Sequence, residues 1–223
     1  MTADTATAPG DGIGPVGGVL LAGGRARRMG GGDKALLALA GRTLLDRAIA
    51  RARPQVDRLV LSANGDPARF AGFGLDIVAD SVGGSAGPLA GVLAGLDHVA
   101  ATLPAARWMA SFPVDAPFFP VDLVGRLAAA VASGAADMAC AASGGRTHPV
   151  FGLWPLAQRE ALRRALVEEG LRKVDAWTAR FRLAVVDFPA EDWAEGCDPF
   201  LNLNRPADLA AAEGFIVVNR RIG

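Results

Sequence analysis

Cysteine, histidine and lysine are all scarce in this chain of 223 residues, which has two of each. Cys140 and Cys197 stand far apart without a CxxC spacing, and two cysteines with two histidines do not supply a zinc site of the usual spacing. The sequence also lacks a Ser-His-Asp pattern, so it does not indicate a covalent nucleophile. These absences exclude the common zinc domains and triad hydrolases, and they favour a reducing compartment.

An excess of charge of one sign and long apolar runs are missing too. The chain carries 23 basic and 23 acidic residues, so no net charge attracts it to nucleic acid or to a membrane surface. The first residues lack the basic start and apolar core of a signal peptide, and the apolar run at 19–22 is far too short to span a bilayer. We therefore expect a cytoplasmic protein that binds neither nucleic acid nor membranes, and in which local groups neutralise any polyanion.

Hydrophobic residues make up 51% of the chain, enough for the core of one α/β domain. Strand-like apolar runs alternate with helical segments, which predicts a Rossmann-like, mostly parallel sheet with helices on both faces. The expected strands are 19–22, 58–63, 76–79, 108–114, 137–142, 148–154, 182–187 and 200–203. The expected helices are one that starts with a capping-box pattern at Thr43, one over 88–101, one that starts at Pro120, and those over 157–169, 171–179 and 206–213.

No composition break marks a linker inside the chain. We expect residues 1–16 to form a flexible leader and residues 17–213 a single domain. Residues 214–223 are then a C-terminal extension, whose apolar run GFIVV favours a strand that pairs with an exposed sheet edge or mediates self-association.

A glycine-rich loop, LAGGRARRMGGGDK at Leu21–Lys34, follows the first expected strand. A P-loop would need glycine before the lysine and Ser or Thr after it, but Asp33 and Ala35 flank Lys34. A dinucleotide fingerprint on the later glycines would start several residues beyond the strand. Two interpretations stay open from these residues alone. The loop is either a mobile surface segment, or a cradle in which glycine backbone N–H groups and the cations Arg28 and Lys34 meet phosphate oxygens.

Further motifs follow in order along the chain. They are LSAN at 61–64, VAD at 78–80, GPLAG at 87–91, PVDAPF at 113–118, THPVFGLW at 147–154, GLRKV at 170–174 and PFLNLNRPADL at 199–209. Together with the LAGG loop, this ordered set resembles the molybdenum cofactor guanylyltransferases of the nucleotidyltransferase superfamily. The resemblance covers residues from about 17 to about 213, implies a nucleotide-diphospho-sugar transferase-like fold, and interprets the glycine-rich loop as a triphosphate cradle.

The resemblance implies transfer of GMP from GTP to the terminal phosphate of molybdenum-loaded molybdopterin, with release of pyrophosphate and with Mg²⁺ as cofactor. Asp115 follows an apolar strand, where open α/β sheets place ligands, and the matching D-x-P aspartate of the family binds the metal. Lys34, Arg28 and Asp115 are the implied catalytic residues. The implied GTP-binding residues are Leu21, Ala22, Gly23, Gly24, Lys34, Asn64, Asp80 and Asp115.

Each of these residues also has a purely structural interpretation. Asp115 before Ala-Pro is compatible with an Asx turn, and Asn64 and Asp80 are good turn formers. Because guanine presents two adjacent N–H donors that a carboxylate accepts together, we hypothesise that Asp80 reads the guanine edge.

The second substrate has weaker sequence signals. His148, Arg172, Lys173, Asn202 and Asn204 match family stretches that line the pterin half of the cleft. His148 before Pro149 is also compatible with a loop contact, and Asn204 with a helix cap. Phe112 and Arg205 depart from the family pattern, which leaves pterin recognition less secure than nucleotide transfer.

Three other functions compete with this interpretation. A cytidylyltransferase acting on the same pterin would use CTP, although that branch tends to carry LAAG in place of LAGG. A non-catalytic nucleotide sensor or cofactor carrier would have little need of both Asp115 and Lys34. A sugar-nucleotide pyrophosphorylase is disfavoured by the THPVFGL and NLNRPADL matches. The expected partners are GTP and molybdenum-molybdopterin, with transient contacts to a molybdopterin-delivering protein and to recipient molybdoenzymes.

Overall fold

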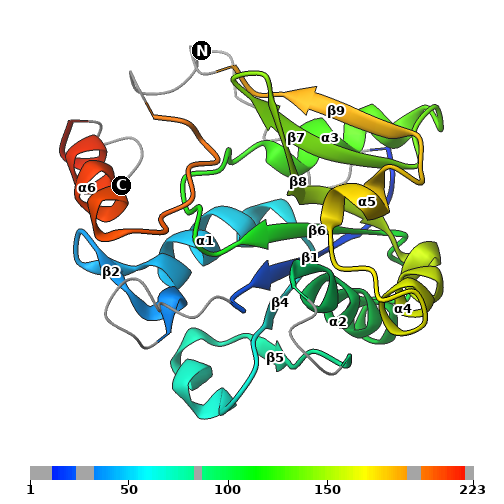
Figure 1. Ribbon diagram of the computed structural model, residues 1–223, viewed down its shortest axis with the longest axis horizontal. Helices are drawn as coiled ribbons and strands as arrows, with labels where there is room; N and C mark the ends of the chain where they lie inside the picture. Colours follow the sequence, from blue (N-terminus) through cyan, green and yellow to red (C-terminus); the bar gives the residue numbers. More distant parts are fainter. Residues whose placement is uncertain (1–11, 24–32, 83–86, 190–196, 219–223) are drawn as a thin grey trace, which may run out of the picture.

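The computed structural model describes residues 12–23, 33–82, 87–189 and 197–218 (Figure 1). Within them, a seven-stranded sheet has the order β5-β4-β1-β6-β8-β7-β9, and β2 and β3 form a separate antiparallel pair. The strands are β1 Val16–Leu21, β2 Ala38–Leu39, β3 Arg42–Thr43, β4 Arg58–Ser62, β5 Asp76–Val78, β6 Trp108–Pro113, β7 Met138–Ser143, β8 Arg146–Pro155 and β9 Leu183–Asp187. Only β8 runs against its neighbours, so the expected mostly parallel sheet is confirmed.

Helices cover both faces of the sheet, as expected for an α/β domain. They are α1 Leu44–Ala52, α2 Pro88–Thr102, α3 Leu123–Ala132, α4 Arg159–Val167, α5 Val174–Thr178 and α6 Pro206–Val218, with 3₁₀ turns η1 Lys34–Leu36, η2 Arg53–Gln55, η3 Pro67–Phe73 and η4 Leu156–Gln158. Buried residues of α1, α3 and α6 form one hydrophobic cluster, and those of α2, α4 and α5 form a second. Among the described residues, none of the helices combines the length and the hydropathy needed to cross a bilayer.

Local sequence signals explain where the two helices nearest the site begin. Thr43 and Asp46 form the predicted capping box at the start of α1, with the Asp46 N–H donating to Thr43 Oγ1 over 3.0 Å. Gly87 has φ +70°, a conformation that favours glycine, and Pro88 then occupies the first turn of α2. Gly95 lets α2 lie directly on the sheet, because a Cβ there would stand 2.7 Å from Val19 Cβ.

The carboxyl ends of four parallel strands lie in register at one edge of the sheet. Leu21, the last residue of β1, pairs with Ser62 at the end of β4 and with Pro113 at the end of β6. Ser62 pairs in turn with Val78 at the end of β5. Residues placed just after these strand ends are therefore brought together, which is the general location of ligand sites in open α/β sheets.

The structure corrects two expected strands. Residues 200–203 form no strand, because Asp198 makes a turn in which its side chain accepts the Phe200 N–H over 2.9 Å and its carbonyl accepts the Leu201 N–H over 3.0 Å. The apolar run after Gly214 continues α6 as far as Val218, and Phe215 and Ile216 pack against the hydrophobic cluster of α1 and α3. Tertiary packing therefore outweighs the β-propensity of this run.

Several boundaries also differ from the expected ones. The first strand begins at Val16 rather than residue 19, α3 begins at Leu123 rather than residue 120, and α5 is shorter than the expected 171–179. Most of the expected leader, residues 1–11, and the end of the expected extension, residues 219–223, lie outside the described residues.

Both cysteines are buried free thiols, Cys140 in β7 and Cys197 in the hydrophobic cluster that includes α1 and α3. Burial raises the pKa of the Cys140 thiol to about 11, and it also raises the pKa of Cys197. Both thiols therefore stay protonated at neutral pH and are poor nucleophiles.

Candidate active site

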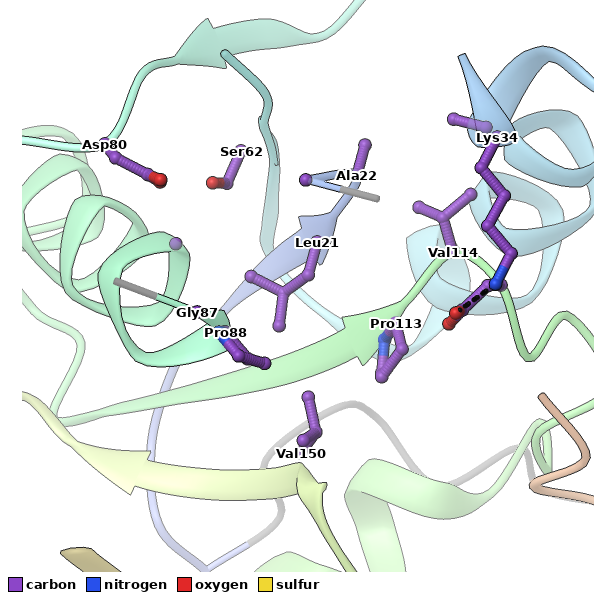
Figure 2. A pocket seen from close by; sticks show the side chains of 14 residues that line it. Leu21, Ala22, Lys34, Ser62, Asp80, Gly87, Pro88, Pro113, Val114 and Val150 are labelled. Atoms are coloured by element: carbon purple, nitrogen blue, oxygen red, sulfur yellow. Dashed lines mark hydrogen bonds and ion pairs between the residues drawn. The ribbon is translucent and has the colours of Figure 1, made fainter. Parts of the chain in front are cut away.

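A pocket opens at the carboxyl edge of β1, β4, β5 and β6, beside the first turn of α2 (Figure 2). Its walls combine backbone from the end of β1, the start of α2, and side chains that follow the other strands. The residues that line it are Leu21, Ala22, Gly23, Lys34, Ala35, Ser62, Asp80, Gly87, Pro88, Gly91, Pro113, Val114, Asp115 and Val150. Of the residues implied for GTP binding, Asn64 lies just beside the pocket, and Gly24 lies outside the described residues, as does Arg28.

Lys34 is the buried cation of this pocket, with 8% of its surface exposed. It is the first residue of η1, whose start is held by Asp33 accepting the Ala35 N–H. Lys34 Nζ donates to Asp115 Oδ2 over 2.6 Å and to Asn204 Oδ1 over 2.5 Å. An ammonium has three N–H donors, so one donor remains for a phosphate oxygen.

Asp115 lies two residues beyond β6, and its carboxylate points to Lys34. The next residue but one is Pro117, which has no N–H for an Asx turn, and the carboxylate instead accepts a hydrogen bond from the Lys34 ammonium. The Asp115 carbonyl accepts the Leu203 N–H over 2.8 Å, so the segment before α6 is anchored at the same place. Within the described parts of the chain, Asp115 Oδ1 has no hydrogen-bond partner.

The donor set fits a magnesium ion that is bound together with a nucleotide. Among the described residues there is no cluster of three or more His, Cys, Asp or Glu side chains that would hold a metal ion unaided. Mg²⁺ is usually bound by one or two carboxylates, substrate phosphates and several waters. Asp115 could supply one such carboxylate at the strand end, with phosphates and waters completing the coordination.

Asp80 lies on the other side of the pocket from Lys34 (Figure 2), and it forms a hydrogen-bonded pair with Asn64. Asn64 Nδ2 donates to Asp80 Oδ2 over 2.7 Å, and the Asp80 N–H donates to Asn64 Oδ1 over 2.9 Å. Each residue lies two positions beyond its strand, β4 or β5. The reciprocal contact orients the Asp80 carboxylate, whose Oδ1 makes no hydrogen bond to any residue that the structure describes.

Arg69, a residue that sequence reasoning missed, joins the two sides of the pocket. From η3, its Nε donates to Asp33 Oδ2 over 2.7 Å, and its Nη2 donates to the Asn64 carbonyl over 2.5 Å. Asp33 caps the turn that carries Lys34, so Arg69 connects the Asn64–Asp80 pair to the cationic side. No local motif signals this role, because the contacts join segments 36 and 5 residues apart in the chain.

A second hollow adjoins the first. It is formed where β8 has a bulge opposite Cys140 and Ala141, which turns the segment around Pro149 out of the regular ladder. Its lining residues are Pro88, Pro113, Asp115, Arg146, Thr147, His148, Pro149, Val150, Phe151 and Asn202. Pro88, Pro113, Asp115 and Val150 line both hollows. Asp115 therefore lies where the two hollows meet.

The structure separates the five residues implied for pterin binding into three groups. His148 and Asn202 line the second hollow. Asn204 contacts Lys34, and α6 is capped instead by Asp208, whose side chain accepts the Asn204 and Arg205 N–H groups over 2.8 Å each. Arg172 donates to the carbonyl oxygens of Leu166 in α4 and of its neighbour Leu171, and Lys173 is exposed at the start of α5.

Comparisons with known proteins identify the same family as the sequence motifs. Residues 18–182 match the model of the MobA-like NTP transferase domain. A molybdenum cofactor guanylyltransferase of Bradyrhizobium sp. (strain ORS 278) is 55% identical over 221 residues, which is 99% of each chain. The crystal structure of molybdopterin-guanine dinucleotide biosynthesis protein A from Archaeoglobus fulgidus is 21% identical and superposes with a TM-score of 0.68, covering 91% of this chain and 99% of the other.

The fold by itself is shared more widely. A 4-diphosphocytidyl-2C-methyl-D-erythritol synthase from Anaerococcus prevotii superposes with a TM-score of 0.69 at 12% identity, covering 95% of this chain and 100% of the other. Fold similarity therefore does not separate the nucleotide branches, whereas the sequence relationship does. By its match to the domain model and its identity to full-length relatives, the chain belongs to the molybdenum cofactor guanylyltransferase family.

Proposed function

We propose that this protein transfers GMP from GTP to the terminal phosphate of molybdenum-loaded molybdopterin and releases pyrophosphate. The observation that carries the proposal is the meeting of two hollows at Asp115, with the buried Lys34 ammonium 2.6 Å from its carboxylate. A reaction between two phosphate-bearing substrates needs such a junction, because both anions must be held close together while their charge is neutralised.

In this reaction an oxygen of the molybdopterin phosphate attacks the α-phosphorus of GTP, and the bond from that phosphorus to the β-phosphate oxygen breaks. Lys34 stabilises the negative charge that grows on the phosphate oxygens, and Asn204 and Asp115 orient its ammonium for this task. A Mg²⁺ ion held by Asp115 would supply further charge neutralisation between phosphate oxygens. No covalent enzyme intermediate is required.

The placement of polar groups favours one orientation of the nucleotide in the first hollow. Lys34 and Asp115 occupy the side next to the second hollow and would take the triphosphate. Asp80 occupies the opposite side (Figure 2) and, together with its partner Asn64, would take the base. A non-catalytic carrier has no need of a paired cation and carboxylate where the two hollows meet, so this geometry favours transfer over storage.

The same proposal extends to the setting of the enzyme. We expect a cytoplasmic protein whose nucleotidyltransferase domain spans residues 17–213, and which makes transient contacts with a molybdopterin-delivering protein and with recipient molybdoenzymes. The match of residues 18–182 to the domain model supports the start and most of the length of that domain.

The direct test is pyrophosphate release with molybdenum-loaded molybdopterin, with GTP, CTP and ATP offered in parallel and with Mg²⁺ present or removed by chelation. We expect release with GTP and Mg²⁺ only. Release with CTP alone would show that the protein is a cytidylyltransferase. Nucleotide binding without release from any donor would identify a carrier or sensor.

Base selection is tested by replacing Asp80 with asparagine. The amide keeps an oxygen for the contact with Asn64, but it lacks the second acceptor that the N1–H and N2–H donors of guanine require. We expect the ratio of kcat/KM for GTP to that for ATP to fall about 10- to 100-fold, the effect of losing a hydrogen bond to a charged group.

Asp76→Asn is the matched control for this change. Asp76 begins the same strand, β5, but its carboxylate contacts Arg58 and His98 away from the pocket. An unchanged donor ratio in Asp80→Asn would show that base selection lies elsewhere.

A further inference from the structure

A buried polar cluster borders the second hollow and is not used by the transfer chemistry. Ser143, the last residue of β7, is 2% exposed, and its Oγ lies 2.8 Å from His148 Nε2 and 2.8 Å from Asp198 Oδ1. The His148 ring stacks on Phe200, with 4.8 Å between ring centroids and 29° between ring planes. His148 itself lines the hollow.

The contacts of Ser143 determine which nitrogen of His148 carries the proton. A hydroxyl has one hydrogen to donate, and a carboxylate accepts hydrogen bonds only. Ser143 therefore donates to Asp198, whose Oδ1 also accepts the Phe200 N–H over 2.9 Å. The Ser143 oxygen then accepts from His148, so the proton lies on Nε2 and Nδ1 is the unprotonated, accepting nitrogen.

The order of the three groups excludes a hydrolytic triad. In such a triad the histidine lies between the serine and the carboxylate and takes the serine proton. Here Ser143 lies between His148 and Asp198, and its proton is directed to the carboxylate. The cluster therefore orients the imidazole and does not activate the hydroxyl.

The groups that face His148 favour its neutral form. Burial lowers the pKa of the imidazole, and Arg146 on the same strand acts in the same direction. Asp198 acts in the opposite direction through its negative charge, but burial has the largest effect. Among the described residues, Ser143 on β7 and Phe200 also contact His148, and neither carries a charge.

We propose that His148 accepts, through Nδ1, a hydrogen bond from an N–H group of the heterocycle of the acceptor substrate, and that Ser143 and Asp198 are positioning residues that hold the Nε2–H tautomer. This inference rests on the proposed function, since it assigns the second hollow to a pterin. A neutral acceptor nitrogen selects ring N–H groups, whereas an imidazolium in the same place would select the phosphate of that substrate.

The tautomer can be measured without any turnover. The chain has only two histidines, so a protein labelled with ¹⁵N-histidine gives two imidazole spin systems, and His98→Gln assigns them. We expect the His148 signals to report a protonated Nε2 and an unprotonated Nδ1 at neutral pH. We expect Ser143→Ala to shift the tautomer balance, and Ser143→Thr to keep it. An imidazolium, or a proton on Nδ1, at pH 7 would overturn the inference.

Kinetics separate recognition of the pterin from a merely structural role. We expect Ser143→Ala to raise the KM for molybdopterin about tenfold, the effect of one weakened hydrogen bond. The KM for GTP and kcat should stay unchanged, and Ser143→Thr should restore the molybdopterin KM. In the unmodified protein the molybdopterin KM should rise as the pH falls through the His148 pKa, because protonation turns Nδ1 from an acceptor into a donor.

Ser133→Ala is the control, since Ser133 is exposed at the end of α3. A molybdopterin KM that is unaffected by Ser143→Ala and flat with pH would refute the proposal while transfer itself continues. Absence of pyrophosphate release from every donor would instead contradict the proposed function, and the tautomer measurement would still stand.

Discussion

Replacing Asp115 with asparagine is expected to lower kcat for pyrophosphate release by about 1,000-fold, the upper range for removing one preorganised electrostatic group. Asparagine has nearly the same shape, so the walls of both hollows are retained. It lacks the negative charge that would hold Mg²⁺ and that now lies 2.6 Å from Lys34 Nζ. The measurement is pyrophosphate release at saturating GTP and molybdopterin, together with GTP binding by calorimetry.

A matched control is available on the same stretch of chain. Asp122→Asn also removes one carboxylate, but Asp122 is exposed before α3 and makes no capping hydrogen bond. We expect this variant to retain its activity. If Asp115→Asn kept kcat within tenfold of the original value while the control was also active, the metal carboxylate would have to lie elsewhere.

Replacing Lys34 with methionine is expected to lower kcat about 100- to 1,000-fold, because it removes the buried ammonium that we propose neutralises the phosphate oxygens. Methionine fills a similar volume without charge. Lys34→Arg should not restore the rate. The single Lys34 nitrogen lies 2.6 Å from Asp115 Oδ2 and 2.5 Å from Asn204 Oδ1, and the larger planar guanidinium does not fit between these two oxygens.

Arg164→Met is the control, because Arg164 is an exposed cation of α4 that lines neither hollow. Single-turnover measurements and thermal unfolding of all three variants separate a loss of catalysis from a loss of folding. Restored activity in Lys34→Arg would mean that positive charge alone suffices, and that the geometry imposed by Asn204 is unimportant.

The alternation of apolar strands with capped or Pro-initiated helices was readable from the sequence because those signals are local. The capping box at Thr43 and the start of α2 at Pro88 are examples, and the mostly parallel sheet followed from them. The strands predicted from local sequence at 200–203 and after Gly214 were wrong. In the first place the Asp198 side chain forms a turn, and in the second α6 packs against a core formed by distant residues.

The sequence by itself determined the family, the α/β class and most of the residues at the strand ends, because motif order and strand-to-loop spacing are properties of adjacent residues. Only the tertiary structure decided which of these residues meet. It brought Asn204 to Lys34 across 170 positions and joined Asp33 to Asn64 through Arg69. It also placed Ser143 between His148 and Asp198. Such contacts depend on strand order, register and the bulge in β8, and these result from packing across the whole sheet rather than from any local pattern.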